Sequence, residues 1–480
     1  MTLAKKTTIG IIWNFTEQIA RSGVGALITL LLAWFLVPAD YGLVAMMAVF
    51  LAIANSLMDS GFRQALIRLQ GATQADFNTA FYANLGLGAI AYLLLFFSAP
   101  IIAGFYHEPR LIILIRVAGL NVLIHAFQVI QSALLNRELN FKAQLQATIP
   151  AGIISGAVAV GLAYFGFGVW ALIVQMLLAS LITTLLLWHI QGWQPTLGFS
   201  RKAFAGMYNF GYKLFLSGLL DTVFLNLYIT VIAKLFTATV AGQYFFAEKL
   251  KDIVLTLFVG SVQQVTYPAL ASLQDDDKRL KAGFRKVIQV TTFLISPAMI
   301  FLAVLAGPLF NVLLPAKWSS AVPYLQLMCI AGIMFPLHVI NLNILKVKGR
   351  SDLFFYLEII KKILAVIILF ISYRYGVMGI LIGQIVGSVI AYIPNSYFAA
   401  RLINYPVREQ MADFLPGFAL SGAVGLLVYA AGHLIHLPVF VQLITFSSTA
   451  GILYIAGAHI LKLQAYVFAR QMVAERLGRG

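Results

Sequence analysis

The stretch AFYANLGLGAIAYLLLFFSAPIIA, residues 80–103, contains no charged residue. The hydrocarbon core of a bilayer is about 30 Å thick, and a helix of roughly twenty apolar residues crosses it. About fourteen stretches of this kind follow one another along the 480 residues, and only 10% of all residues are charged. A soluble core of this length would need far more polar surface. The sequence therefore predicts a polytopic membrane protein.

The apolar stretches are predicted to be helices. Strands of a transmembrane barrel would alternate polar and apolar residues, and these stretches do not. The expected fold class is an all-α polytopic membrane protein with about fourteen transmembrane helices. We place them at residues 11–36, 42–62, 80–103, 111–134, 147–165, 168–188, 211–233, 239–260, 288–310, 322–344, 356–373, 376–398, 414–434 and 439–461.

Basic residues collect in every second gap between these stretches. If the N-terminus is cytoplasmic, the inner gaps and both termini hold about 25 of the 33 Lys and Arg residues, and the outer gaps about four. This split predicts a bacterial inner-membrane protein with both termini in the cytoplasm. Topology and contact with anionic membrane lipids account for the net charge of +16, so no nucleic-acid partner is expected.

The chain repeats itself weakly after about 200 residues. Phe35–Gly42 resembles Leu235–Gly242, and Phe167–Ser180 resembles Tyr375–Ser388. Six spans return the chain to the same side, so two such halves should share one orientation, with the substrate site between them, as in transporters built from parallel repeats. We predict an N-terminal six-helix lobe over 1–192, a C-terminal six-helix lobe over 205–402, two extra helices over 413–463 and a cytoplasmic tail over 464–480.

Several charged residues lie inside the predicted spans, where they are costly and usually face a bundle interior or a water-filled cavity. Glu17 and Arg21 are four residues apart on one helix face, with Arg21 about 15 Å inside the span. They either neutralise each other or place a cation in a cavity. The same alternatives hold for the four charges between 248 and 252. Near the inner edge of the second span, Asp59 and Arg63 favour a simple salt bridge.

These charges suggest a phosphate-bearing substrate, because Arg and Lys recognise phosphate oxygens through charge-assisted hydrogen bonds. They gather on spans 1, 7 and 8, with help from span 2. We assign substrate binding to Arg21, Lys249, Lys251, Arg63 and Asn226, and charge balance or ion coupling to Glu17, Asp59, Asp221, Glu248 and Asp252.

Sequence signatures of enzymes are missing from the chain. His, Cys and carboxylate residues show no metal-ligand spacing, and no phosphate-binding loop, GxSxG or HExxH pattern occurs. The outer gaps are also too short for the polar loop of a membrane polymerase. We therefore expect a protein that is not an enzyme and has no metal site and no cofactor.

Short segments in order along residues 10–400 carry a family resemblance; they include Asp59–Arg68, Ala133–Lys142, Gly242–Ala247 and Lys348–Asp352. The chain resembles the Wzx-like polysaccharide transporters, in particular the colanic-acid exporter-like branch of the multidrug/oligosaccharidyl-lipid/polysaccharide superfamily. The resemblance implies a flippase that moves undecaprenyl-pyrophosphate-linked oligosaccharide repeat units to the periplasmic leaflet, for export of exopolysaccharide, capsule or O-antigen.

The same resemblance implies alternating access around a cationic cavity lined by spans 1, 2, 7 and 8. Arg21 corresponds in kind to a cavity arginine on the first helix of related lipid-linked flippases. Cytoplasmic glycosyltransferases and a polymerase are further candidate partners. Two other functions stay open: a drug/cation antiporter of the same superfamily, and a membrane polysaccharide polymerase.

Overall fold

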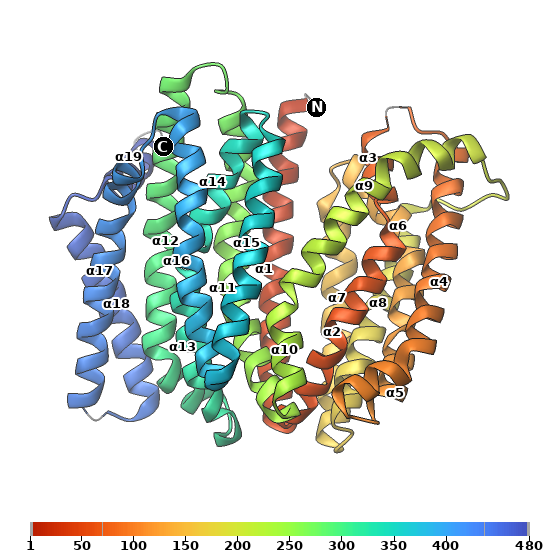
Figure 1. Cartoon of the computed structure of the whole chain (residues 1–480), viewed down its shortest axis with the longest axis horizontal. Helices are drawn as coiled ribbons and strands as arrows, with labels where there is room; N and C mark the ends of the chain where they lie inside the picture. Colours follow the sequence, from red (N-terminus) through yellow and green to blue (C-terminus); the bar gives the residue numbers. More distant parts are fainter. Residues whose placement is uncertain (1–2, 70, 436, 478–480) are drawn as a thin grey trace. The chain divides into compact units, whose positions relative to one another are not determined.

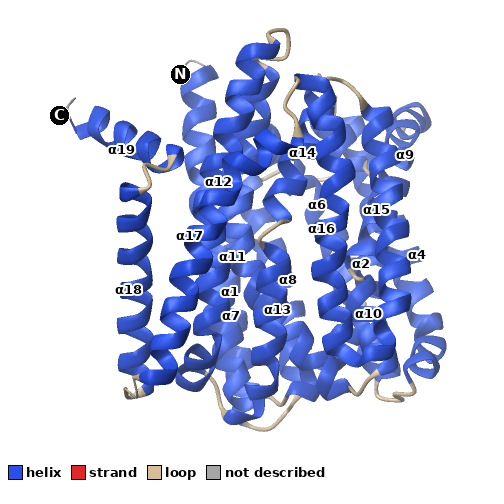
Figure 2. Cartoon of the chain, turned by 60° about the vertical axis from the view of Figure 1, so that its left-hand side comes forward, coloured by secondary structure: helices blue, strands red, loops and turns tan. Residues whose placement is uncertain are grey.

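The computed structural model describes residues 3–69, 71–435 and 437–477, and within these ranges it contains helices and connecting segments but no strand (Figure 2). The predicted all-α fold is therefore confirmed. Residues 1–2 of the predicted first lobe and residues 478–480 of the predicted tail lie outside the described part of the chain.

Among the described residues, ten helical segments are long and apolar enough to cross a membrane. The pair α9 (Arg201–Leu225) and α10 (Leu227–Leu235), bent by 44°, would form an eleventh span. The remaining three predicted spans coincide with α11 (Ala238–Ala271), α15 (Ser351–Ser372) and α16 (Gly376–Ile403). Two of these helices carry charges within the predicted span, at 248–252 in α11 and at 358–362 in α15.

Two compact units divide the chain, and the first comprises residues 1–245. Within it, α7 packs against both α1 and α8, while α6 packs against α4 and α8. Figure 1 shows α9 running alongside α2 and α3, and these helices are in contact. Besides α9, α10 and the first turns of α11, the unit consists of α1 (Leu3–Phe35), α2 (Pro38–Asp59), α3 (Phe62–Arg68), α4 (Gln74–Tyr106), α5 (Leu111–Ala118), α6 (Leu120–Arg137), α7 (Phe141–Tyr164) and α8 (Val169–Gln191).

The second unit comprises residues 246–480. Its longest helix, α12, packs against α13, α17 and α18, while α16 packs against α14 and α15. The two extra helices predicted near the C-terminus are thus α17 and α18, and the predicted tail contains the helix α19. The elements not yet bounded are α12 (Asp277–Leu313), η1 (Ala316–Ala321), α13 (Val322–Gly332), α14 (Phe335–Val347), η2 (Tyr373–Tyr375), α17 (Val407–Leu434), α18 (Val439–Ile460) and α19 (Gln464–Leu477).

The units divide at residues 245/246, inside α11, and not in the polar linker between the two predicted lobes. The physical reason is that α9 and α10 pack against α2, α3 and α4. By their contacts, α9 and α10 belong to the first unit, whereas the sequence repeat assigns them to the second predicted lobe. The lobe boundaries at 1–192 and 205–402 stay a prediction based on the repeat.

A matching pair of hydrogen bonds occurs in the two units. In the first, His125 on α6 and Ser180 on α8 are joined by a 3.0 Å contact between Nε2 and Oγ. In the second, His338 on α14 and Ser388 on α16 make the same contact at 3.0 Å. The two pairs agree with the predicted repeat, in which Ser180 and Ser388 are equivalent.

At both ends of helix α2, glycines allow another segment of backbone to approach closely. At its start, a Cβ added to Gly42 would lie 1.8 Å from the Ala238 carbonyl oxygen, and one added to Gly242 would lie 1.7 Å from the Pro38 carbonyl oxygen. At its end, Gly61 (φ +76°) contacts Gly211 of α9. Only glycine allows backbones to approach so closely. All of these residues belong to the first unit.

Candidate functional site

The charged pair predicted on α1 has one buried and one exposed member. Glu17 exposes 8% of its surface, whereas Arg21, one turn further on, is exposed. The two side chains attract each other electrostatically. Mutual neutralisation of this pair and a cation that faces a cavity both stay predictions.

Asp59 and Arg63 lie on either side of the break between α2 and α3. The break is made by two left-handed residues, Ser60 (φ 39°) and Gly61 (φ 76°). Arg63 Nε lies 3.8 Å from Asp59 Oδ2, while Asp59 Oδ1 is buried and has no hydrogen-bond partner among the described residues. The salt bridge expected from the four-residue spacing is therefore present, at the outer limit of ion-pair distance.

Asn226 is the residue at which α9 ends and α10 begins. Its side-chain Nδ2 donates to the Thr222 carbonyl oxygen at 2.8 Å, and its own carbonyl oxygen accepts from Thr230 Oγ1 at 2.7 Å. Both carbonyl oxygens also accept a backbone N–H, from Asn226 at 3.3 Å and from Thr230 at 3.0 Å, so the side-chain bonds reinforce the backbone bonds at the bend. Asp221 lies on the exposed side of α9, little more than one turn earlier. The geometry gives Asn226 a structural task in addition to the ligand contact predicted for it.

Among the four charges on α11, Glu248 attracts Lys251 and Lys249 attracts Asp252, the pairs expected from helix spacing, and a direct ion pair joins two neighbours in the chain. Lys251 Nζ lies 3.1 Å from Oδ1 of its immediate neighbour Asp252. The Lys251 side chain is 19% exposed and its stem approaches Gly332 of α13, whereas Asp252 is 56% exposed. Lys249 is exposed and Glu248 is half-buried.

The predicted site residues are divided between the two units. Those of α1, α2, α3, α9 and α10 belong to the first unit, and those of α11 after residue 245 belong to the second. Within the units, the structure brings together Asp59 with Arg63 and Lys251 with Asp252. Their assignment to substrate binding or charge balance stays a prediction. Groups of three or more His, Cys, Asp or Glu able to hold a metal do not occur among the described residues.

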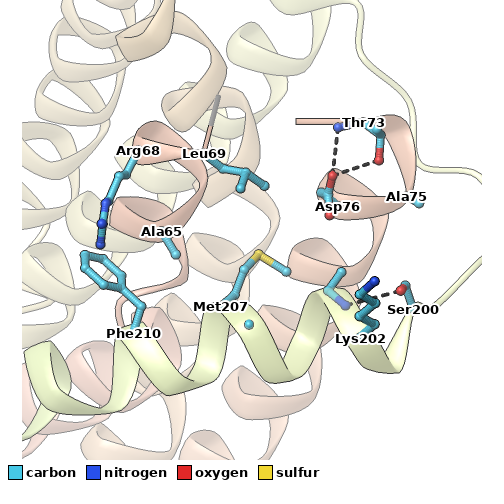
Figure 3. Close-up of a pocket in the computed structure, with 12 residues that line it drawn as sticks. Ala65, Arg68, Leu69, Thr73, Ala75, Asp76, Ser200, Lys202, Met207 and Phe210 are labelled. Atoms are coloured by element: carbon cyan, nitrogen blue, oxygen red, sulfur yellow. Dashed lines mark hydrogen bonds between the residues drawn. The ribbon is translucent and has the colours of Figure 1, made fainter. Parts of the chain in front are cut away.

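A pocket that sequence reasoning missed lies at one end of the first unit (Figure 3). Its volume is about 570 Å³, and its walls come from α3, the start of α4 and the start of α9. Arg68 and Lys202 contribute the basic groups of the lining. From the sequence, both residues count only among the basic residues of the cytoplasmic side, and this count could not show that they line one cavity. Their separation of more than 130 positions explains why local pattern could not reveal it.

A second cavity, of about 670 Å³, lies in the second unit among α12, α17 and the segment joining α18 to α19. Its polar wall is an ion-pair network in which Asp413 accepts two bonds from Arg285, at 2.7 and 2.9 Å, and one from Gln289 at 2.6 Å. Tyr405, between α16 and α17, also donates to Asp413. Burial, followed by this hydrogen bond, raises the pKa of Tyr405, so its hydroxyl stays protonated.

The profile of a family described as "Polysaccharide biosynthesis protein" matches residues 31–323, which is more than half of the chain. The chain belongs to this family. It is 26% identical to the lipopolysaccharide biosynthesis protein WzxC of Escherichia coli, over 90% of this chain and 89% of that protein. It is 25% identical to the succinoglycan biosynthesis transport protein ExoT of Rhizobium meliloti, over 75% of this chain and 73% of that protein.

The fold of this family member is also found among solved structures. The lipid II flippase MurJ, in an inward closed conformation, superposes with a TM-score of 0.72 and covers 98% of this chain and 99% of MurJ. At 13% identity this likeness concerns the fold alone. The resemblance to Wzx-like polysaccharide transporters, carried in the sequence by segments such as Asp59–Arg68, is confirmed. So is the prediction of a multi-pass membrane protein.

Proposed function

We propose that this protein is a flippase that moves undecaprenyl-pyrophosphate-linked oligosaccharides from the cytoplasmic to the periplasmic leaflet by alternating access. The observation that carries the proposal is the alignment with WzxC over 90% of the chain, since it places the protein among polysaccharide biosynthesis proteins. The fold shared with a lipid II flippase supports it. No catalytic step is needed, because the cargo crosses the membrane without a change in its covalent bonds.

The cations on the membrane helices are the groups we propose to contact the pyrophosphate during the transport cycle. Arg21 and Lys249 are our first candidates, because both side chains are exposed on predicted membrane helices. Lys251, paired with Asp252, and Arg63, paired with Asp59, would contribute less. We assign charge balance or ion coupling to Glu17, Asp221 and Glu248, and place both termini in the cytoplasm.

The proposal is tested by transport of a fluorescent undecaprenyl-pyrophosphate oligosaccharide in proteoliposomes. Arg21→Gln and Lys249→Gln should each slow transport by about tenfold or more, since a hydrogen bond to a charged group contributes roughly 1.5–3 kcal/mol. Arg279→Gln is a matched control, because Arg279 is an exposed residue at the start of α12 that pairs with Asp276 at 3.6 Å. Transport that is unchanged in both Arg21→Gln and Lys249→Gln would remove the proposed role of these cations.

Two other functions make different predictions in the same preparation. A drug/cation antiporter would move cationic dyes against an ion gradient and leave the lipid-linked sugar in place. A membrane polymerase would lengthen the sugar chain without any change of leaflet. Accumulation of lipid-linked repeat units on the inner leaflet of cells that lack the protein would favour the flippase over both. Cytoplasmic glycosyltransferases and a polymerase would then be its neighbours in the pathway.

A further inference from the structure

The pocket of Figure 3 combines two basic side chains with an apolar floor. Arg68, at the end of α3, lies toward one end of it, and Lys202, in the first turn of α9, lies toward the other. Between them the lining includes Ala65, Leu69 and Met207. The volume of about 570 Å³ falls within the ~300–1,000 Å³ typical of small-molecule sites.

The two cations of the pocket are available to a ligand. Arg68 lies over the ring of Phe210, with its guanidinium carbon 4.8 Å from the ring centroid. Stacking of this kind fixes the guanidinium plane and leaves its N–H edge free to bind an oxyanion in a bidentate manner. Within the described part of the chain, neither Arg68 nor Lys202 forms an ion pair, and both side chains are exposed.

The single carboxylate of the lining is already occupied. Asp76 Oδ2 accepts from the backbone nitrogen of Thr73 at 2.8 Å and from Thr73 Oγ1 at 2.7 Å. These are the bonds of a helix cap at the start of α4, and Figure 3 shows them at the edge of the pocket. These bonds hold the carboxylate at the helix start, although it keeps its negative charge. With Arg68 and Lys202 the formal charge of the pocket lining is still positive.

The wall formed by α9 is held in place by the linker before it. Asn78 of α4 exchanges two hydrogen bonds with Thr196, at 2.6 and 3.1 Å. The Ser200 backbone nitrogen donates to Thr79 Oγ1 at 3.0 Å. These bonds hold the segment 196–200, here called the strap, against α4. Since Lys202 follows two residues after Ser200, the strap fixes the backbone at Lys202, while its side chain is exposed.

The surroundings of the pocket have the character of a membrane interface. Leu197, Phe199 and Tyr208, on the linker and the start of α9, are 98%, 52% and 47% exposed. Large apolar and aromatic side chains beside basic residues are typical of segments that lie at the headgroup level of a bilayer. A ligand that enters this pocket from the membrane would be amphipathic, with a charged headgroup and an apolar part.

We infer that this pocket binds an anionic phospholipid headgroup, with its phosphate at Arg68, the glycerol and the start of the acyl chains over Ala65, Leu69 and Met207, and Lys202 adding positive charge at the other end of the pocket. The chemistry that the pocket recognises is a phosphate ester. Membrane lipid is the source that fits the apolar floor and the exposed aromatic rim, whereas a soluble phosphate would use only the cations. This site lies within the first unit and is separate from the cations assigned to transport.

The test is retention of dihexanoyl phosphatidylglycerol by the purified full-length protein, measured by native mass spectrometry, with dihexanoyl phosphatidylcholine as the zwitterionic probe. Arg68→Gln and Lys202→Gln should each weaken phosphatidylglycerol binding by about five- to tenfold, and Arg68→Lys by less, because it keeps the charge and loses the bidentate edge. Arg201→Gln is the matched control: Arg201 is the exposed neighbour of Lys202, and it does not line the pocket.

Several outcomes would overturn the inference. If Lys202→Gln and Arg201→Gln weaken phosphatidylglycerol binding equally, the loss reflects the overall charge of the protein and not this pocket. If the double variant Arg68→Gln/Lys202→Gln binds phosphatidylglycerol as well as the wild type, the pocket is not the lipid site. Displacement of the lipid by a similar concentration of inorganic pyrophosphate would refute the lipid assignment. An unchanged elution volume and unfolding temperature would show that the variants are folded. Since lipid retention is read without transport, failure here leaves the proposed flippase function untouched.

Discussion

The glycine crossing at the start of α2 offers a sharp test of how this protein is packed. A methyl group at Gly42 would lie 1.8 Å from the carbonyl oxygen of Ala238 and 2.6 Å from its carbon. Contacts of a Cβ below 3.0 Å essentially do not occur. Because the atoms it meets belong to backbone, no side chain can rotate away, and the starts of α2 and α11 must separate by more than 1 Å.

We expect Gly42→Ala to destabilise the protein by about 3 kcal/mol, the upper part of the range for overpacking in a closely packed interior. This corresponds to a fall of roughly 3–6 °C in unfolding temperature for a chain of this size. Gly242→Ala should have a similar effect, since its Cβ would lie 1.7 Å from the Pro38 carbonyl oxygen. The measurement is thermal unfolding of the detergent-purified protein followed by intrinsic tryptophan fluorescence.

The matched control is Gly86→Ala, within α4. Its added Cβ would have no neighbour within 4 Å, so the substitution should be neutral or stabilise the helix by up to about 1 kcal/mol. If Gly42→Ala and Gly86→Ala unfold at the same temperature, the close approach of α2 and α11 is absent from the protein in solution, and the packing described for the start of α2 is wrong.

Two further predictions concern polar contacts within single units. Asp413→Asn should destabilise the protein by about 2–4 kcal/mol, because the Arg285 guanidinium, which Asp413 binds bidentately at 2.7 and 2.9 Å, loses its counter-charge. The control Glu409→Gln removes a more exposed partner of Lys281 and should cost at most about 1 kcal/mol. Equal shifts in unfolding temperature for the two variants would contradict the role given to the Arg285–Asp413 pair. Asn78→Ala removes both hydrogen bonds to Thr196 and should speed limited trypsin cleavage at Arg201 and Lys202 by about fivefold, as expected from losing about 1 kcal/mol of local stability. Gln74→Ala, which removes the hydrogen bond from Trp193, is the comparison. Cleavage of Asn78→Ala at the wild-type rate would show that other contacts hold the linker.

Predictions from sequence pattern succeeded for features that depend on residues close together in the chain. Each apolar stretch became helical, because in a bilayer a backbone can satisfy its hydrogen bonds only within a helix or a closed barrel. The predicted spans 111–134, 211–233 and 322–344 are each divided into two helices, which local pattern did not indicate. The family resemblance could likewise be recognised from short segments such as Asp59–Arg68. Even the Asp59–Arg63 contact followed from four-residue spacing, since both residues lie within one turn of the same break.

Predictions of pairing were weaker where several partners compete. Lys251 is bound by Asp252, its neighbour in the chain, although Glu248 lies at helical spacing. The side chain of Lys251 runs beside Gly332 of α13, so the packing of another helix decides which carboxylate it meets. Helical periodicity places Glu248, and not the adjacent Asp252, on the face of Lys251, so it could not predict the 3.1 Å contact with Asp252.

The order of apolar and polar segments along the chain was enough to determine the class of protein, its helices and its family, because span length, charge content and short motifs depend on neighbours in sequence. The packing of the folded chain alone decided that α9 belongs with α2 and α3, and that Arg68, Phe210 and Lys202 line one pocket. Those residues are far apart along the chain, and their meeting depends on backbones that approach closely only where glycines such as Gly61 and Gly211 leave room.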